Sequence, residues 1–176
     1  ASSHFAAAVQ LLERAISLAP ESTSGRVRTP TKADGMLELA WVRYDQGSYQ
    51  AALSQIDELL RLESNPESVV HASAHYLRGR TLDANNQGLA ALADWGVFVD
   101  DALDQHPDAA SARRQIIAVA TRLGLEARAR NTRADAQAAV ELFVRAQDAA
   151  EAADWRFPSP WPVEYAPGFG VDQAGI

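Results

Sequence analysis

Apolar residues recur along the chain with the period of an amphipathic helix. In the first twenty residues one stripe with this spacing is formed by Phe5, Ala8, Val9, Leu12, Ala15, Ile16 and Ala19. Pro20 follows, and proline cannot continue a helix because it lacks the backbone N–H and clashes with the preceding turn. We therefore predict a first helix that ends before Pro20, followed by a Ser/Thr/Pro-rich loop over residues 21–32.

The same periodicity predicts four further helices, over residues 32–46, 49–63, 66–84 and 89–105. Thr31 and Asp34 have the spacing of a capping box at the start of the second helix. Gly47 with Ser48 provides a turn to the third. Pro66 stands where the first residue of the fourth helix is expected, since proline suits that position.

An alanine-rich helix pair is predicted over about 109–130 and 133–154, with a weak break at Asn131 and Thr132. Four of the eight prolines and three of the ten glycines lie in residues 158–176, which excludes a regular helix there. Strand patterns are nearly absent. We expect an all-α fold, with a helical domain over 1–157 and an extended Pro-rich tail over 158–176.

Two segments about 39 residues apart share an order of small and large side chains. The first contains Leu39, Ala40, Gly47, Tyr49, Ala52 and Ile56, and the second contains Gly79, Leu82, Ala91 and Trp95. This order resembles the tetratricopeptide repeat family, well over residues 33–66 and moderately over 72–105, with partial or degenerate units on either side. The resemblance implies antiparallel helix pairs stacked as a right-handed superhelix. An unrelated alanine-rich helical bundle is the alternative.

In that family the first helix of each repeat lines a concave groove that holds a partner segment. Matching positions give Leu37 and the partner-binding candidates Trp41, Tyr44, Asp45, Tyr76, Arg80 and Asp83. Arg beside Trp and Tyr is typical of interface hot spots. Trp41 and Tyr76 equally suit core packing between successive units. Family members that clamp a terminal carboxylate need Lys and Asn where Leu37 and Trp41 stand, so binding of that kind is not expected.

Composition narrows the classes of function. The 176 residues are 47% hydrophobic and 22% charged, as in a folded domain of ordinary size, and the chain has no cysteine. The net charge of -7 argues against a general binder of nucleic acids. Residues 108–133 are net +4, but aromatic residues that would stack on bases are not interleaved. No apolar run is long enough to predict a membrane span.

Motifs of catalysis are absent from the sequence, including a nucleophile elbow, a phosphate loop and a dinucleotide fingerprint. Glu67, His71 and His75 recur every four residues, but Ala72 stands where a zinc-protease helix has its catalytic Glu, and no third strong ligand is visible in the sequence. We therefore expect no enzyme activity, no metal and no cofactor.

These observations favour a protein-protein interaction scaffold or adaptor that binds a partner segment in its groove. A second interpretation is a non-catalytic helical domain of a larger cell-envelope enzyme such as a soluble lytic transglycosylase, because residues 156–172 resemble the junction before the catalytic part of those enzymes. A third has the tail docking on another chain or in the chain's own groove. Scarce Lys with abundant Arg and Ala suggests a bacterial source, and the lack of Cys is compatible with either the cytoplasm or the periplasm and cell envelope.

Overall fold

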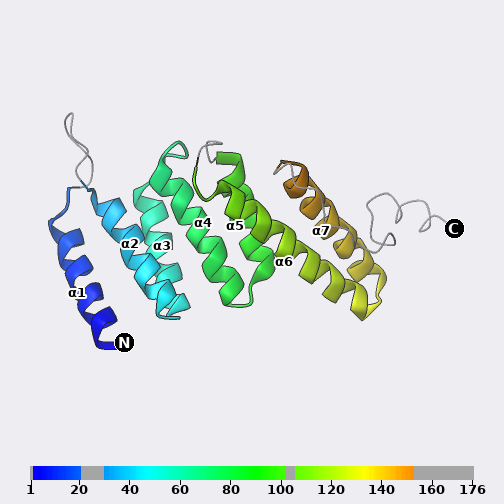
Figure 1. Cartoon of the computed structure of the whole chain (residues 1–176), viewed down its shortest axis with the longest axis horizontal. Coiled ribbons are helices and arrows are strands. Elements are labelled where there is room, and N and C mark those ends of the chain that lie inside the picture. The colour runs from blue at the N-terminus through cyan, green and yellow to red at the C-terminus, as the bar shows by residue number, and fades with distance from the viewer. Residues whose placement is uncertain (1, 21–29, 102–105, 153–176) are drawn as a thin grey trace. The chain divides into compact units, whose positions relative to one another are not determined.

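The computed structural model describes residues 2–20, 30–101 and 106–152, and the regular secondary structure of these residues is all α-helix, as predicted. No strand occurs among them (Figure 1). The helices are α1 (Ser2–Leu18), α2 (Lys32–Asp45), α3 (Tyr49–Leu62), α4 (Val69–Ala84), α5 (Gly88–Asp101), α6 (Ala109–Arg130) and α7 (Arg133–Ala152). The proposed tail over 158–176 lies outside the described residues.

The chain divides into two compact units, Ala1–His106 and Pro107–Ile176. In the first unit α1 packs on α2, α2 on α3, α3 on α4 and α4 on α5, and α2 also contacts α4. In the second unit α6 packs on α7. Whether the helices form one domain over 1–157 stays a prediction.

The predicted capping box opens α2. The backbone N–H of Asp34 donates to the Thr31 hydroxyl at 3.2 Å, and the backbone N–H of Thr31 donates to the Asp34 carboxylate at 2.8 Å. At the other end of the helix Gly47 has φ +72°, a conformation that favours glycine, and the N–H of Ser48 reaches the carbonyl of Arg43 at 2.9 Å. Local sequence therefore defines both ends of α2.

Removing the cap should weaken the fold measurably. We expect Thr31→Ala to lower the free energy of unfolding by about 1 kcal/mol, because the Asp34 N–H loses its acceptor. Thr31→Ser retains an acceptor oxygen and should stay close to wild type. Urea denaturation followed by circular dichroism measures both variants, and equal stability of the Ala and Ser variants would contradict this role of the cap.

The prediction that the fourth helix begins at Pro66 is wrong by three residues. The side chain of Asn65 accepts the backbone N–H of Glu67 at 3.1 Å, and the carbonyl of Asn65 accepts the N–H of Ser68 at 3.0 Å. These two bonds close a separate turn, so that α4 begins at Val69 with Ser68 as its N-cap. Asn65 is therefore a turn residue.

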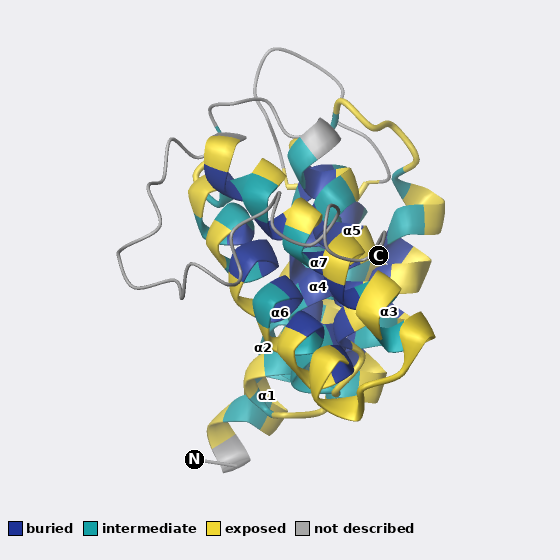
Figure 2. Cartoon of the chain, turned by 90° about the vertical axis from the view of Figure 1, so that its right-hand side faces the viewer, coloured by how far each residue is buried: buried dark blue, intermediate teal, exposed yellow. Residues whose placement is uncertain are grey.

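Small residues allow the helices of the first unit to approach closely. One buried cluster joins α2, α3 and α4 and contains Ala33, Met36, Ala40, Ile56, Leu59, Val70, Ala74 and Leu77. Figure 2 shows the mixture of buried and exposed positions along the helices that an amphipathic stripe produces. Between α4 and α5, Gly79 lies against the indole of Trp95, which is 1% exposed.

The second unit repeats this use of small residues. Ala127 of α6 and Ala139 and Ala146 of α7 are buried. The ring of Phe143 lies against Gly124, where an added Cβ would be 3.1 Å from its nearest atom. Asn131, with φ 54°, ends α6 in the left-handed conformation and confirms the predicted break.

Candidate functional site

Helix α2 has one side that no neighbouring helix covers completely. Its buried residues Met36, Leu39 and Ala40 point into the fold, and Gly35 lies against Ile16 of α1. The remaining side carries partly exposed apolar and aromatic residues together with two exposed carboxylates. We define the α2/α4 face as Leu37, Glu38, Trp41, Tyr44 and Asp45 of α2 with Tyr76, Arg80 and Asp83 of α4.

The centre of the α2/α4 face is an arginine surrounded by aromatic rings. The Arg80 guanidinium carbon lies 5.2 Å from the ring centroid of Trp41, 4.9 Å from that of Tyr44 and 5.9 Å from that of Tyr76. One of its N–H groups also donates to the Tyr44 hydroxyl at 3.4 Å. Cation–π contacts of this length are attractive. They hold the long Arg80 side chain in one place.

The rings also contact one another. Trp41 and Tyr44 meet edge to face with centroids 5.9 Å apart, and Trp41 and Tyr76 are tilted with centroids 6.3 Å apart. The structure therefore brings together four of the residues that the sequence proposed for binding. Trp41, Tyr44 and Arg80 are partly exposed, so a partner could reach them.

Tyr76 does not have the exposed position that the family register implied. It is 3% exposed, and its ring packs on Phe98 of α5 with centroids 5.3 Å apart. The helical position of Tyr76 lies between the face and α5, and the size of its ring fills that space. Tyr76 is therefore a core residue on which the face packs. Core packing was the second role that the sequence allowed for it.

The acidic residues of the α2/α4 face differ in how far they are exposed. Asp45 is exposed at the C-terminal end of α2, and Asp83 is partly exposed on α4. Glu38, which sequence reasoning did not single out, is exposed one turn before Trp41. Counting the acidic residues three or four positions from Trp41 in the sequence would have found Glu38.

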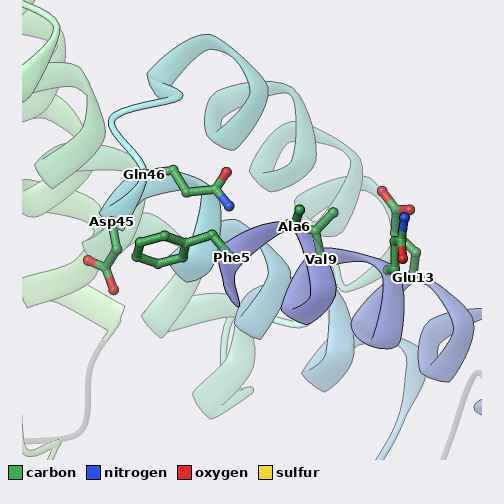
Figure 3. Close-up of a pocket in the computed structure, with 7 residues that line it drawn as sticks. Phe5, Ala6, Val9, Glu13, Asp45 and Gln46 are labelled. Carbon is green, nitrogen blue, oxygen red and sulfur yellow. The ribbon is translucent and has the colours of Figure 1, made fainter. Parts of the chain in front are cut away.

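Asp45 also borders a cleft between α1 and α2 with a volume of about 720 Å³. The cleft is lined by Phe5, Ala6, Val9, Gln10, Glu13, Asp45 and Gln46. Figure 3 shows the Phe5 side chain pointing toward Asp45 and Gln46. Glu13, at the opposite end, accepts a hydrogen bond from Arg43 at 3.2 Å. Sequence reasoning missed this cleft, because it treated the α1 stripe only as a packing surface.

A chain of polar contacts joins α3, α4 and α5 away from the face. His75 Nδ1 lies 2.8 Å from Asp94, and the Arg78 guanidinium lies 3.4 Å from Asp94 and 3.2 Å from Asp57. Asp94 is 7% exposed, so these partners compensate the cost of burying its carboxylate. No spacing rule predicts from sequence a contact among residues on three different helices.

The histidines that suggested a metal have other surroundings. His71 and His75 meet edge to face with ring centroids 4.8 Å apart, and His75 is bonded to Asp94. Within residues 2–20, 30–101 and 106–152, no group of three or more potential ligands is placed to hold a metal ion.

The fold also brings together one serine and one histidine that no catalytic motif in the sequence had indicated. Ser73 Oγ lies 3.1 Å from His106 Nε2. Ser73 is inside α4, however, where the backbone N–H groups are used by the helix itself and do not form the oxyanion site that acyl transfer needs. This pair therefore offers a hydrogen bond rather than a reaction centre.

The described helices include none that is both long and apolar enough to cross a membrane. Comparisons of the chain with protein-family models, with curated proteins and with solved structures found no match.

Proposed function

We propose that the chain is a non-catalytic binding scaffold that captures a segment of another protein on its α2/α4 face. The observation that carries this proposal is the arginine of α4 held among rings at a partly exposed surface, Arg80 with Trp41 and Tyr44. The packing of α1 to α5 on one another in chain order supports a tetratricopeptide-like stack as the frame of the face.

The physical basis is the low entropic cost of binding to groups that are already fixed. Trp41 and Tyr44 have few rotatable bonds and much surface, so they can bury a large area against a partner. The three rings around Arg80 restrict its side chain before any partner arrives. Less conformational freedom is then lost on binding than for a free arginine.

The test is a selection of random displayed peptides on the full chain. We expect clones enriched on the wild type to bind a Trp41→Ala, Arg80→Ala double variant at least tenfold more weakly, because both hot-spot groups are gone. Titration of a labelled synthetic copy of each clone, followed by fluorescence anisotropy, measures the affinities. Far-ultraviolet circular dichroism should show that the double variant remains helical.

A matched control removes similar groups elsewhere in the first unit. Arg61 and Leu62 are exposed at the end of α3, and the Arg61→Ala, Leu62→Ala variant should retain wild-type affinity. The proposal is contradicted if no clone is enriched, or if the Trp41, Arg80 variant binds the clones as tightly as this control does.

A further inference from the structure

The charge of the face indicates what kind of segment it binds. We propose that the captured segment is basic, with Lys or Arg side chains that pair with Glu38 and Asp45 on the two sides of Trp41. This inference rests on the proposed function. The occupant is thus a segment of another protein that combines cationic residues with an apolar or aromatic one.

Acidic side chains outnumber basic ones on the α2/α4 face. Glu38 and Asp45 are exposed, Asp83 is partly exposed, and Arg80 is the one cation among the residues that define the face. Three rings surround its guanidinium. Residues 1–106 as a whole contain fourteen Asp and Glu against eight Lys and Arg. A cationic segment would therefore be attracted both at a distance and on contact.

The other arginines of α2 and α4 do not neutralise these carboxylates. Arg43 donates to Glu13 at 3.2 Å and to Gln55 at 3.0 Å, on the sides of α2 that meet α1 and α3. Arg78 pairs with Asp57 and Asp94, on the side of α4 that meets α3 and α5. Both cations are engaged away from Glu38 and Asp45, and among the residues that the structure describes neither carboxylate has an ion-pair partner.

The spacing of the two carboxylates suits an extended segment. Glu38 and Asp45 are seven residues apart on one helix, which corresponds to about 10 Å along its axis. In a polyproline II segment, residues three apart lie on the same side and about 9 Å from each other. Two basic residues at that interval could meet both carboxylates while a residue between them packs near Trp41.

The cleft beside Asp45 gives one of these cations a place for its aliphatic stem. Phe5, Ala6 and Val9 form its apolar wall, and Figure 3 shows Phe5 directed toward Asp45. A Lys or Arg side chain can lay its methylene groups on such a wall while its charged head reaches a carboxylate. The Phe5 ring adds a cation–π surface for that head. Asp45 is thus the carboxylate where ion pairing and apolar contact coincide.

The experiment uses three fluorescein-labelled peptide pools that are identical except at two positions three residues apart. These positions hold Lys or Arg in the first pool, Gln in the second and Glu in the third, and the positions between them are apolar mixtures. We expect the full chain to bind the basic pool most tightly. The Glu38→Gln, Asp45→Asn variant should bind that pool about fivefold more weakly or worse, with a smaller difference at about 0.5 M salt.

The control separates this site from the general negative charge of the chain. A Glu58→Gln, Glu67→Gln variant loses the same amount of charge at exposed positions outside the face and should bind the basic pool like wild type. A Phe5→Leu variant keeps an apolar wall and should lose about twofold to threefold in affinity, the contribution of the ring.

The outcomes distinguish the two proposals. If the Gln or Glu pool binds best and Trp41→Ala abolishes that binding, the basic segment is ruled out and the scaffold function stands. If the basic pool binds but both double variants weaken it equally, attraction is general and the assignment to Glu38 and Asp45 fails. If no pool binds the chain although the displayed selection enriches clones, the basic segment is ruled out and the scaffold function stands; if neither yields a bound peptide, both proposals are contradicted.

Discussion

Gly79→Ala is expected to lower the free energy of unfolding by about 2 kcal/mol, although alanine is the better helix former. A Cβ at Gly79 would lie within 2.7 Å of three atoms of the Trp95 indole, namely Nε1, Cδ1 and Cε2. Trp95 is 1% exposed and donates its Nε1–H to the carbonyl of Tyr76 at 3.2 Å, so the ring cannot move aside freely. Overpacking of about 3 kcal/mol then exceeds the helix-propensity gain of about 1 kcal/mol.

The matched control is the same substitution on the neighbouring helix. Gly96 of α5 has no heavy atom within 4 Å of an added Cβ, so Gly96→Ala should raise stability by up to about 1 kcal/mol. Urea denaturation followed by circular dichroism gives both values. Equal effects of the two substitutions would show that Trp95 does not occupy the space beside Gly79.

Leu77→Ala is expected to cost about 3 kcal/mol of unfolding free energy. Leu77 is 0% exposed and belongs to the cluster that joins α2, α3 and α4, so its truncation removes buried surface and leaves a cavity. Leu89→Ala on α5 is the control, since that side chain is 66% exposed and should change stability by less than about 0.5 kcal/mol. The same denaturation experiment measures both, and a loss below about 1 kcal/mol for Leu77→Ala would contradict the cluster as the core of the first unit.

The contact between Gly79 and Trp95 explains why the sequence could predict much of the fold. Ala40 and Ile56 stand 39 residues before these two, and both are buried in one cluster. The larger Trp95 replaces Ile56, and the smaller Gly79 replaces Ala40, so the two helix pairs reach close packing with different side chains. The period of the apolar residues and the cap and breaker residues are local signals, and they predicted the helices within a few residues.

Properties that depend on several helices could not be predicted in the same way. The exposure of Tyr76 is decided by Phe98 of α5, which lies 22 residues further along the chain. Asp94 is buried because His75 and Arg78 converge on it from another helix. The start of α4 depends on whether Asn65 caps a helix or closes a separate turn. In each case three-dimensional contacts decide between structures that the sequence pattern allows equally.

The α2/α4 face contains some residues that local sequence signals predict and others that depend on contacts between helices. Its α2 residues follow from helix spacing, because Trp41, Tyr44 and Asp45 lie on one side of a helix whose other side is apolar. The position of Arg80 among three rings requires the packing of α4 on α2. The contribution of Glu38 and of the cleft beside Asp45 became visible only once α1, α2 and α4 were in place.

The most direct test of the binding face is nuclear magnetic resonance of the ¹⁵N-labelled full chain, titrated with a peptide enriched in the displayed selection. We predict the largest chemical-shift changes at the backbone amides of residues 37–45 and 76–83 and at the Trp41 indole N–H. The amides of α6 and α7 should change little. Changes concentrated on α6 and α7, or an unchanged Trp41 indole signal at saturation, would contradict capture on the α2/α4 face.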